Sequence, residues 1–291
     1  MSTTTFEVLE EHKAFGGRLV RFKHLSEACG HMVAYVYVPP REAGCPALYV
    51  LGGLTASDAN CATKLATAQQ AAAQHGVVLV FPDTSPREGP DDEHPLLGRG
   101  ASYYVDATRE PWSSHYGMFS YVTDELPRLI EATFHTSGRS ICGHSMGGHG
   151  ALVAFLRKSN LYASCSAFAP VSNPSAIPPP APAWRAFSAY LGGGTVDDSP
   201  DAPWREIWRS YDACELIKAY DGRPLQILVD QGAADPKIHV LGARRLVDAA
   251  KLNDKVTLEY REQAGYDHDL ATFVATFVAD HVAYHASRHQ K

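Results

Sequence analysis

The feature that most constrains this chain is the run Gly143-His144-Ser145-Met146-Gly147, a Gly-x-Ser-x-Gly pattern between two different kinds of segment. Residues 140–142 before it predict the end of a buried strand, and residues 150–156 after it predict a helix packed on one side. A serine held in a sharp strand-to-helix turn needs glycine neighbours, because the adjacent backbone must pass without a Cβ. The pattern therefore predicts a strained turn that raises the Ser145 hydroxyl above a sheet.

Length, composition and charge narrow the fold class and the partners. The chain has 291 residues, of which 45% are hydrophobic, and this suits one α/β domain over residues 1–291 better than two independent domains. The net charge of -6 provides no long-range attraction to nucleic acid or to an anionic membrane. An anionic substrate would therefore need a local cation.

The termini and the cysteines bear on location. The N-terminal residues lack the basic start and apolar core of a secretory signal, and no stretch approaches the ~20 apolar residues that span a bilayer. The six cysteines are scattered, without the paired spacing of a zinc site or a disulfide framework. We therefore expect a cytoplasmic protein with reduced, mostly buried thiols and with neither a membrane nor a nucleic-acid partner.

Apolar runs separated by turn signals predict the order of the elements. An antiparallel pair is expected over residues 6–25, and further strands at 32–38, 47–51, 77–81, 140–142, 165–169, 225–230 and 256–262. Helices are expected at 60–74, 118–133 with a kink at Pro127, 150–156, 240–251 and 270–285, with irregular segments at 84–117 and 170–182. This order predicts a mostly parallel sheet with helices on both faces, which is the α/β-hydrolase arrangement.

In that arrangement an acid and then a histidine follow the serine, each after a later strand. Asp230 ends the strand expected at 225–230 and Asp235 lies five residues beyond it, and the residues alone leave the choice between them open. His268 is the only histidine in the loop after the last expected strand, where Asp267 and Asp269 predict a cap on the last helix. The histidine would take the serine proton and the carboxylate would orient the imidazole, which predicts a triad for acyl transfer.

Acyl transfer also needs two backbone N–H groups that face the developing oxyanion. Met146, directly after the serine, would supply one of them. The other is expected from the loop after residues 47–51, where Gly52-Gly53 lets an N–H turn inward; we choose Leu54, with Gly53 as the alternative. His144 and His149 flank the serine without a third ligand at metal-binding spacing, so neither a metal nor another cofactor is expected.

Eight short motifs are spread over nearly the whole chain: Gly52 to Thr55, Pro82 to Arg87, Tyr104 to Thr108, His115-Tyr116, Gly143 to Gly150, Ser166 to Pro170, Asp230 to Gly232 and Gly265 to His268. In these motifs and in their order, the sequence resembles the S-formylglutathione hydrolase family, also called esterase D. The resemblance implies a serine thioesterase that cleaves S-formylglutathione to formate and glutathione, as in formaldehyde detoxification. It implies Ser145, Asp235 and His268 as the triad, and so selects Asp235 over Asp230.

The resemblance also implies the Leu54 and Met146 amides as the oxyanion hole, no metal, and often a homodimer. This chain departs from the family pattern near the site. Ala56 and Ser57 stand where the family has Cys-Thr, and Asp269 and Leu270 stand where it has Ser-Tyr. The tryptophan expected after the proline-rich stretch is displaced to Trp184.

These departures lead to two functional hypotheses. The first is the thioesterase, with a narrow acyl pocket for the formyl group and with substrate contacts from Gly53, His144, Trp184 and Arg185. Because glutathione carries two carboxylates, we expect a nearby cation among Lys64, Arg87, Arg99 and Arg185. The alternative is a carboxylesterase acting on small acyl esters with weakened glutathione recognition. A non-catalytic binding module would usually lack a triad residue, and none is missing here.

Overall fold

The computed structural model describes residues 6–41, 44–194 and 202–289. One nine-stranded sheet runs through it in the order β1-β2-β3-β5-β4-β6-β7-β8-β9. Its strands are β1 (Phe6–Ala14), β2 (Gly17–Ser26), β3 (Gly30–Val38), β4 (Ala47–Leu51), β5 (Val78–Pro82), β6 (Arg139–His144), β7 (Cys165–Phe168), β8 (Leu225–Gly232) and β9 (Val256–Gln263). The pairs from β1 to β5 along this order are antiparallel, and those from β5 to β9 are parallel. The predicted mostly parallel sheet is confirmed.

Burial explains which strands were easy to predict. Every residue of β4 and β5 is buried, as expected for parallel strands covered on both faces. In β2, buried positions alternate with more exposed ones, so this antiparallel end of the sheet has one face toward solvent. The centre of the sheet is therefore enclosed, and the active-site turn follows one of its central strands.

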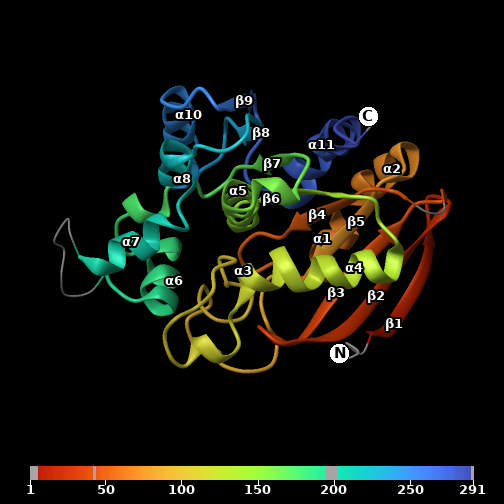
Figure 1. Ribbon diagram of the computed structural model, residues 1–291, viewed down its shortest axis with the longest axis horizontal. Helices are drawn as coiled ribbons and strands as arrows, with labels where there is room; N and C mark the ends of the chain where they lie inside the picture. The colour runs from red at the N-terminus through yellow and green to blue at the C-terminus, as the bar shows by residue number, and fades with distance from the viewer. Residues whose placement is uncertain (1–5, 42–43, 195–201, 290–291) are drawn as a thin grey trace.

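Helices cover both faces of the sheet (Figure 1). They are α1 (Asp58–Lys64), α2 (Ala66–His75), α3 (Met118–Ser120), α4 (Leu126–Phe134), α5 (Met146–Arg157), α6 (Pro182–Leu191), α7 (Pro203–Arg209), α8 (Ala213–Ala219), α9 (Ile238–Leu241), α10 (Ala243–Lys251) and α11 (Ala275–Ser287). On β7, the Cys165 Sγ lies 3.6 Å from a carbonyl oxygen of α5, whereas the next residue, Ser166, hydrogen-bonds to α11. Because successive strand residues point to opposite faces, α5 and α11 cover opposite faces.

Several predicted helices are interrupted. The helix expected at 60–74 is divided into α1 and α2, because Leu65 leaves the helical region with φ −104° and ψ 46°. Gly242, with φ 75°, separates α9 from α10 within the helix expected at 240–251. The helix expected at 118–133 with a kink at Pro127 is divided into α3, a π-helical turn at Tyr121–Glu125 and α4, and Pro127 lies in the first turn of α4, where proline is favoured. A second π-helical turn, Leu270–Val274, precedes α11.

The sequence pattern does not predict α6, α7 and α8, which lie between β7 and β8 along the chain. Pro182 and Pro203 occupy the first turns of α6 and α7, where proline is favoured. The Asp212 carboxylate caps α8 by accepting hydrogen bonds from two of its first N–H groups, at 2.9 and 3.2 Å. Figure 1 shows α6 and α7 on the side of the molecule away from β1 to β3. Short 3₁₀ turns occur at Trp112–Ser114, Ser159–Leu161 and Pro174–Ala176.

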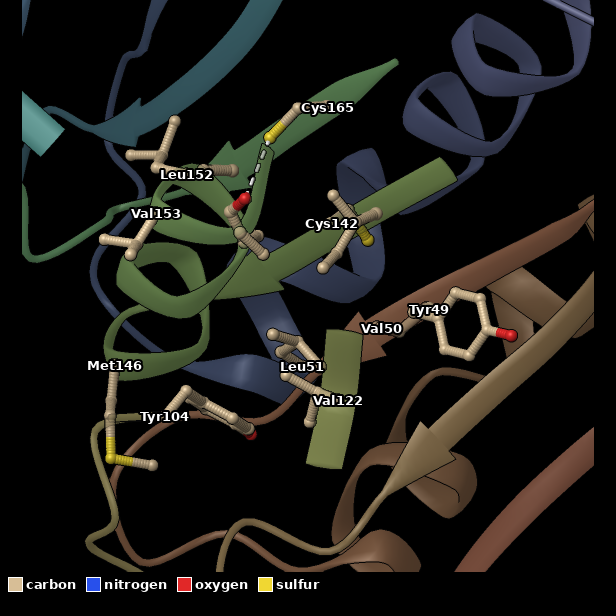
Figure 2. Close-up of a cluster of buried hydrophobic side chains, with 14 of the residues drawn as sticks. Tyr49, Val50, Leu51, Tyr104, Val122, Cys142, Met146, Leu152, Val153 and Cys165 are labelled. Atoms are coloured by element: carbon tan, nitrogen blue, oxygen red, sulfur yellow. Dashed lines mark hydrogen bonds between the residues drawn. The ribbon is translucent and has the colours of Figure 1, made fainter. Parts of the chain in front are cut away.

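The hydrophobic core reaches the turn that carries Ser145 (Figure 2). In that view Met146 and Tyr104 lie at the start of α5, with Leu51 of β4 nearby and Cys142 on β6. The Tyr104 hydroxyl donates to the Gly52 carbonyl oxygen at 3.0 Å, which ties the loop after β4 to this core. All six cysteines are buried and unpaired. Across the described ranges, no helix has the length and apolar character needed to cross a membrane.

Candidate active site

The turn between β6 and α5 holds Ser145 in a strained backbone conformation. Its φ of 57° and ψ of −114° lie outside the regions that a residue with a side chain usually adopts. A Cβ added to Gly147 would lie 2.0 Å from the Leu51 carbonyl oxygen, and one added to Gly143 would lie 2.2 Å from the Gly147 carbonyl oxygen. Close backbone approach therefore requires both glycines of the pattern, as the sequence predicts.

Ser145, His268 and Asp235 form one hydrogen-bonded chain. The His268 Nε2 lies 2.9 Å from the Ser145 Oγ, and its Nδ1 lies 2.7 Å from the Asp235 Oδ2. The His268 side chain is 11% exposed, and that of Asp235 is completely buried. The three residues meet because β6, β8 and β9 belong to one parallel run of strands, whose carboxyl ends share an edge of the sheet.

The two candidate acids have different partners. Asp230, within β8, forms a bidentate pair with Arg261 of β9 at 2.6 and 2.8 Å and accepts a further hydrogen bond from Gln263. Asp235 lies beyond the end of β8 and contacts His268. The folded chain thus brings Asp235, and not Asp230, to the imidazole.

Asp235 is held by three hydrogen-bond donors. Besides His268, the backbone N–H of Lys237 donates to its Oδ1 at 2.7 Å, and the Gln231 Nε2 donates to its Oδ2 at 2.9 Å. Burial alone would raise the pKa of Asp235, but these bonds, led by that from His268, lower it. The carboxylate therefore keeps its charge at neutral pH, which favours a proton on the His268 Nδ1 and leaves Nε2 to accept the serine proton.

His144 is a neutral neighbour of the catalytic imidazole. The rings of His144 and His268 have centroids 4.7 Å apart. Burial, with a contribution from the nearby His268, lowers the pKa of His144 to about 3. Because His144 is uncharged at neutral pH, it does not oppose the positive charge that His268 gains when it takes a proton.

Two backbone N–H groups close to Ser145, those of Leu54 and Met146, have no acceptor in the described part of the chain. Met146 is the first residue of α5, so its N–H has no acceptor within the helix. Leu54 follows Gly53, where an added Cβ would lie 3.4 Å from the Ser145 Cβ. Unpaired donors beside the serine suit a charge that develops only during reaction.

Two cavities open at Ser145. The polar cavity, of about 250 Å³, is lined by Gly53, Leu54, Thr55, Ala56, Asn60, Lys64, His144, Ser145, Lys237, His268, Asp269 and Leu270. The apolar cavity, of about 270 Å³, is lined by Leu54, Leu96, Tyr103, Ser145, Val171, Ile177, Ala181, Pro182, Ala183, Lys237, Val240 and Leu241. A substrate bound at Ser145 thus meets one polar and one apolar compartment.

Comparisons with known proteins identify the family. The Esterase family model matches residues 26–284. Mouse S-formylglutathione hydrolase is 44% identical over 284 residues, which cover 92% of this chain and 94% of the mouse protein. The bovine S-formylglutathione hydrolase is 43% identical, over 90% of this chain and 93% of the bovine protein. The chain belongs to the S-formylglutathione hydrolase family.

The fold agrees with this family assignment. A solved S-formylglutathione hydrolase from Agrobacterium tumefaciens has a TM-score of 0.88 and 40% identity to this chain, and the match covers 97% of this chain and 99% of the other. A serine hydrolase of Staphylococcus aureus, FphF, is 16% identical with a TM-score of 0.70, which indicates a shared fold. The predicted family and the predicted α/β-hydrolase fold are both confirmed.

The remaining predicted site residues of this member of the S-formylglutathione hydrolase family fall into two groups. Gly53, His144 and Lys64 line the polar cavity. Trp184 and Arg185, on α6, line neither cavity, although residues 181–183 just before them line the apolar one. Neither residue therefore lines the two cavities that open at Ser145.

Two further predicted cations are engaged elsewhere. The Arg87 Nε donates to Asp83 at 2.9 Å, and the Arg99 Nε lies 3.2 Å from an Asp91 oxygen. No sequence pattern predicted a role at the site for Gln231 or Lys237. The only indication in the sequence was their position within four residues of Asp235, one on either side of it.

Proposed function

We propose that this protein hydrolyses S-formylglutathione to formate and glutathione, with Ser145 as nucleophile, His268 as general base and Asp235 as the acid that orients it. The observation that carries the proposal is the continuous chain of hydrogen bonds from the Asp235 carboxylate through His268 to the Ser145 Oγ. The 42% to 44% identity to mammalian S-formylglutathione hydrolases supports the choice of substrate.

The proposed reaction has two halves. The Ser145 Oγ attacks the formyl carbon while the His268 Nε2 takes its proton, and the oxyanion accepts hydrogen bonds from the Leu54 and Met146 N–H groups. The carbon–sulfur bond then breaks and glutathione leaves, with His268 returning the proton to sulfur. A thiol, with a pKa near ~8.5, is a good leaving group. Water deprotonated by His268 attacks the formyl ester, releases formate and restores Ser145.

A side-by-side assay tests the substrate. The purified protein is given S-formylglutathione and, separately, p-nitrophenyl acetate, and kcat/KM is measured for each. The proposal requires the thioester to be the better substrate. A kcat/KM that is far higher on the acetate ester would replace the thioesterase with an esterase.

The apolar cavity favours a second activity, hydrolysis of carboxylic esters with small acyl groups. Its volume of about 270 Å³ exceeds what a formyl group needs, since an apolar cavity of about 150 Å³ already accommodates benzene. The acyl pocket is therefore wider than the narrow one expected from the formyl substrate. A series of p-nitrophenyl esters from acetate to hexanoate measures how much of this volume an acyl chain can use. A steep fall in kcat/KM for acyl chains longer than acetate would argue against this second activity.

We also propose a cytoplasmic homodimer. The family resemblance supports the dimer, and six unpaired, buried cysteines suit a reducing compartment. Light scattering on the purified protein tests the dimer, and cell fractionation tests the location.

A further inference from the structure

Besides its histidines, the polar cavity is lined by three charged side chains, Lys64, Lys237 and Asp269. We propose that these three side chains bind the glutathione portion of the substrate: the two lysines bind its two carboxylates, and Asp269 binds its ammonium group. This assignment rests on the proposed hydrolysis of S-formylglutathione and adds to it the residues that recognise the thiol half of the substrate.

Lys64 is held close to the oxyanion amides by a short, well-capped helix. It lies in the last turn of α1, which begins directly after the Leu54 loop. Ser57 and Asn60 cap the start of this helix with reciprocal hydrogen bonds of 3.2 and 3.0 Å. Within the described ranges the Lys64 ammonium group has no carboxylate partner. The charge is therefore available to a ligand that enters the polar cavity.

Lys237 is tied to the triad through its backbone. Its N–H donates to the Asp235 Oδ1 at 2.7 Å, which fixes the start of its side chain relative to the catalytic acid. The side chain is exposed and lines both cavities beside Ser145. No carboxylate in the described segments pairs with it. Among the residues that the structure describes, this cation has no acidic partner, and a ligand anion near Ser145 could pair with it directly.

Within the described part of the chain, the Asp269 side chain accepts hydrogen bonds through only one of its two carboxylate oxygens. As predicted, it caps the helical segment that follows His268: its Oδ1 accepts the N–H groups of Ala271 and Thr272 at 2.7 and 3.1 Å. Its Oδ2 accepts no hydrogen bond from the described part of the chain. One oxygen thus anchors the loop beside the catalytic histidine, and the other is open to the cavity that this residue lines.

The charges of this trio complement those of glutathione. At neutral pH glutathione carries a glycyl carboxylate, a glutamyl α-carboxylate and a glutamyl ammonium group, and the cavity offers two cations and one anion. On a chain of net charge -6, the two lysines, which have no carboxylate partner in the described part of the chain, add positive potential where an anion would bind. The other predicted cations do not compete for this role: Arg87 and Arg99 have acidic partners, and Arg185 lines neither cavity.

The test compares two thioesters that share the reacting group. One is S-formylglutathione, and the other is S-formyl-N-acetylcysteamine, which has a similar thiol leaving group and no charge. The measured quantity is the ratio of their kcat/KM values in the wild type, Lys64→Gln, Lys237→Gln and the double variant. We expect the ratio to fall about three- to tenfold in each single variant and about 10- to 100-fold in the double variant, mainly through KM for S-formylglutathione.

A lysine outside the cavity provides the control. Lys251, on α10, pairs with Asp248 at 2.9 Å, and Lys251→Gln should leave the ratio unchanged. The role of Asp269 is tested with S-formyl-N-acetylglutathione, which lacks the ammonium group. The wild type should prefer the substrate with a free ammonium about threefold, and Asp269→Asn should lose that preference.

The outcomes separate this assignment from the proposed function. A double-lysine variant that keeps the wild-type ratio within twofold would overturn the assignment, while hydrolysis of S-formylglutathione by the wild type would stand. Equal preference of Asp269→Asn and wild type for the two glutathione substrates would remove Asp269 from the site. If the wild type released formate from neither thioester, the proposed function itself would fail, and this assignment with it.

Discussion

Gln231 is a buried amide whose contacts point to a role in orienting the catalytic acid. Its Nε2 donates to the Asp235 Oδ2 at 2.9 Å and to the Gly232 carbonyl oxygen at 3.2 Å. This donor is among the groups that lower the pKa of Asp235. Gln231 does not contact the reacting serine, so it acts as a positioning residue.

Replacing Gln231 should slow the reaction and raise the pH below which kcat falls. We expect Gln231→Leu to lower kcat about tenfold with little change in KM, because the carboxylate that orients His268 loses a donor. The wild-type reaction should lose activity at low pH, when the coupled His268–Asp235 pair takes up a proton and His268 can no longer accept that of Ser145. A carboxylate that loses a donor favours this extra proton on the pair, so activity should begin to fall at a higher pH in the variant. A pH series of kcat measures both effects.

The control for this variant is another buried glutamine. Gln69 donates to the Ala62 carbonyl oxygen at 2.6 Å, away from the site. In Gln69→Leu, kcat should begin to fall at the same pH as in the wild type. An equal shift of that pH in both variants would mean that Gln231 has no specific effect on Asp235.

Removing the nucleophile should abolish the reaction without unfolding the protein. Ser145→Ala is expected to lower kcat by about 10⁴-fold or more. Its thermal midpoint should stay close to that of the wild type, because the Oγ contacts only His268 among the described side chains. The matched control is Ser172→Ala, a nearby buried serine whose Oγ donates to the Pro170 carbonyl oxygen at 3.1 Å. Substantial activity in Ser145→Ala would contradict the mechanism.

At the level of elements, α11 is joined to the sheet by an internal polar network. The Ser166 Oγ on β7 lies 2.8 Å from the His285 Nε2 and 2.8 Å from the His281 Nδ1. The His285 Nδ1 in turn lies 2.8 Å from the Ser164 Oγ. These groups are completely or almost completely buried, so the network must be satisfied internally.

Breaking this network should lower stability and leave the active site intact. Ser166→Ala leaves two buried imidazole nitrogens without a partner, at a cost of about 1–3 kcal/mol for each. Urea denaturation measures the change in the free energy of unfolding. Ser287→Ala, at the exposed end of α11, removes a hydroxyl that donates to the Tyr284 carbonyl oxygen and should cost little. Equal destabilisation by the two variants would show that the network does not stabilise the docking of α11.

Some elements could be read from the sequence and others could not. The strands β4 and β5 were predictable because a continuous apolar run of that length suits only a buried strand or helix segment. The break at Leu65 carries no proline or glycine signal in the sequence. The helices α7 and α8 were missed because they span only seven residues each, and α6 was missed because it directly follows a proline-rich stretch that has no hydrophobic period.

At the scale of the whole molecule, buried neutral histidines make stability depend on pH. Burial lowers the pKa of His24 to about 4, and burial together with the nearby His268 lowers that of His144 to about 3. Burial also lowers the pKa of His149 to about 3 and moves those of His281 and His285 downward. The unfolded chain protonates such residues below pH ~6.5, whereas the folded chain keeps them neutral. The contribution of these neutral histidines to the free energy of unfolding is therefore fully present above that pH, and it is lost as the pH decreases toward 4.

The contribution of one histidine can be isolated. Each of these groups adds up to about 1.4 kcal/mol per pH unit to the slope of unfolding free energy below pH 6.5. His24, whose Nε2 lies 2.9 Å from the Tyr121 hydroxyl, has a higher pKa than His144 and His149. His24→Gln should reduce the slope by about that amount, measured by urea denaturation between pH 6.5 and pH 4.5. An unchanged slope, or an equal reduction in the exposed-site control His75→Gln, would contradict the prediction.

The sequence by itself determined the parts of this protein that depend on neighbours along the chain. The strand-turn-helix around Ser145 is local, because its glycines and flanking apolar runs specify both the elements and the bend between them. The place of His268 follows from the order of strands, which the hydrophobic pattern also records. The residues alone did not decide whether Asp230 or Asp235 is the acid of the triad, and the family resemblance was needed to select Asp235.

Only the tertiary structure decided which side chains meet at Ser145. It pairs Asp230 with Arg261, directs Asp235 to His268, places Gln231 behind that carboxylate, and brings Lys64 and Lys237 to one cavity while leaving Trp184 and Arg185 outside it. The reason is geometric. These residues lie on loops that follow different strands, and their distances are set by sheet register and helix packing, which no local pattern in the sequence encodes.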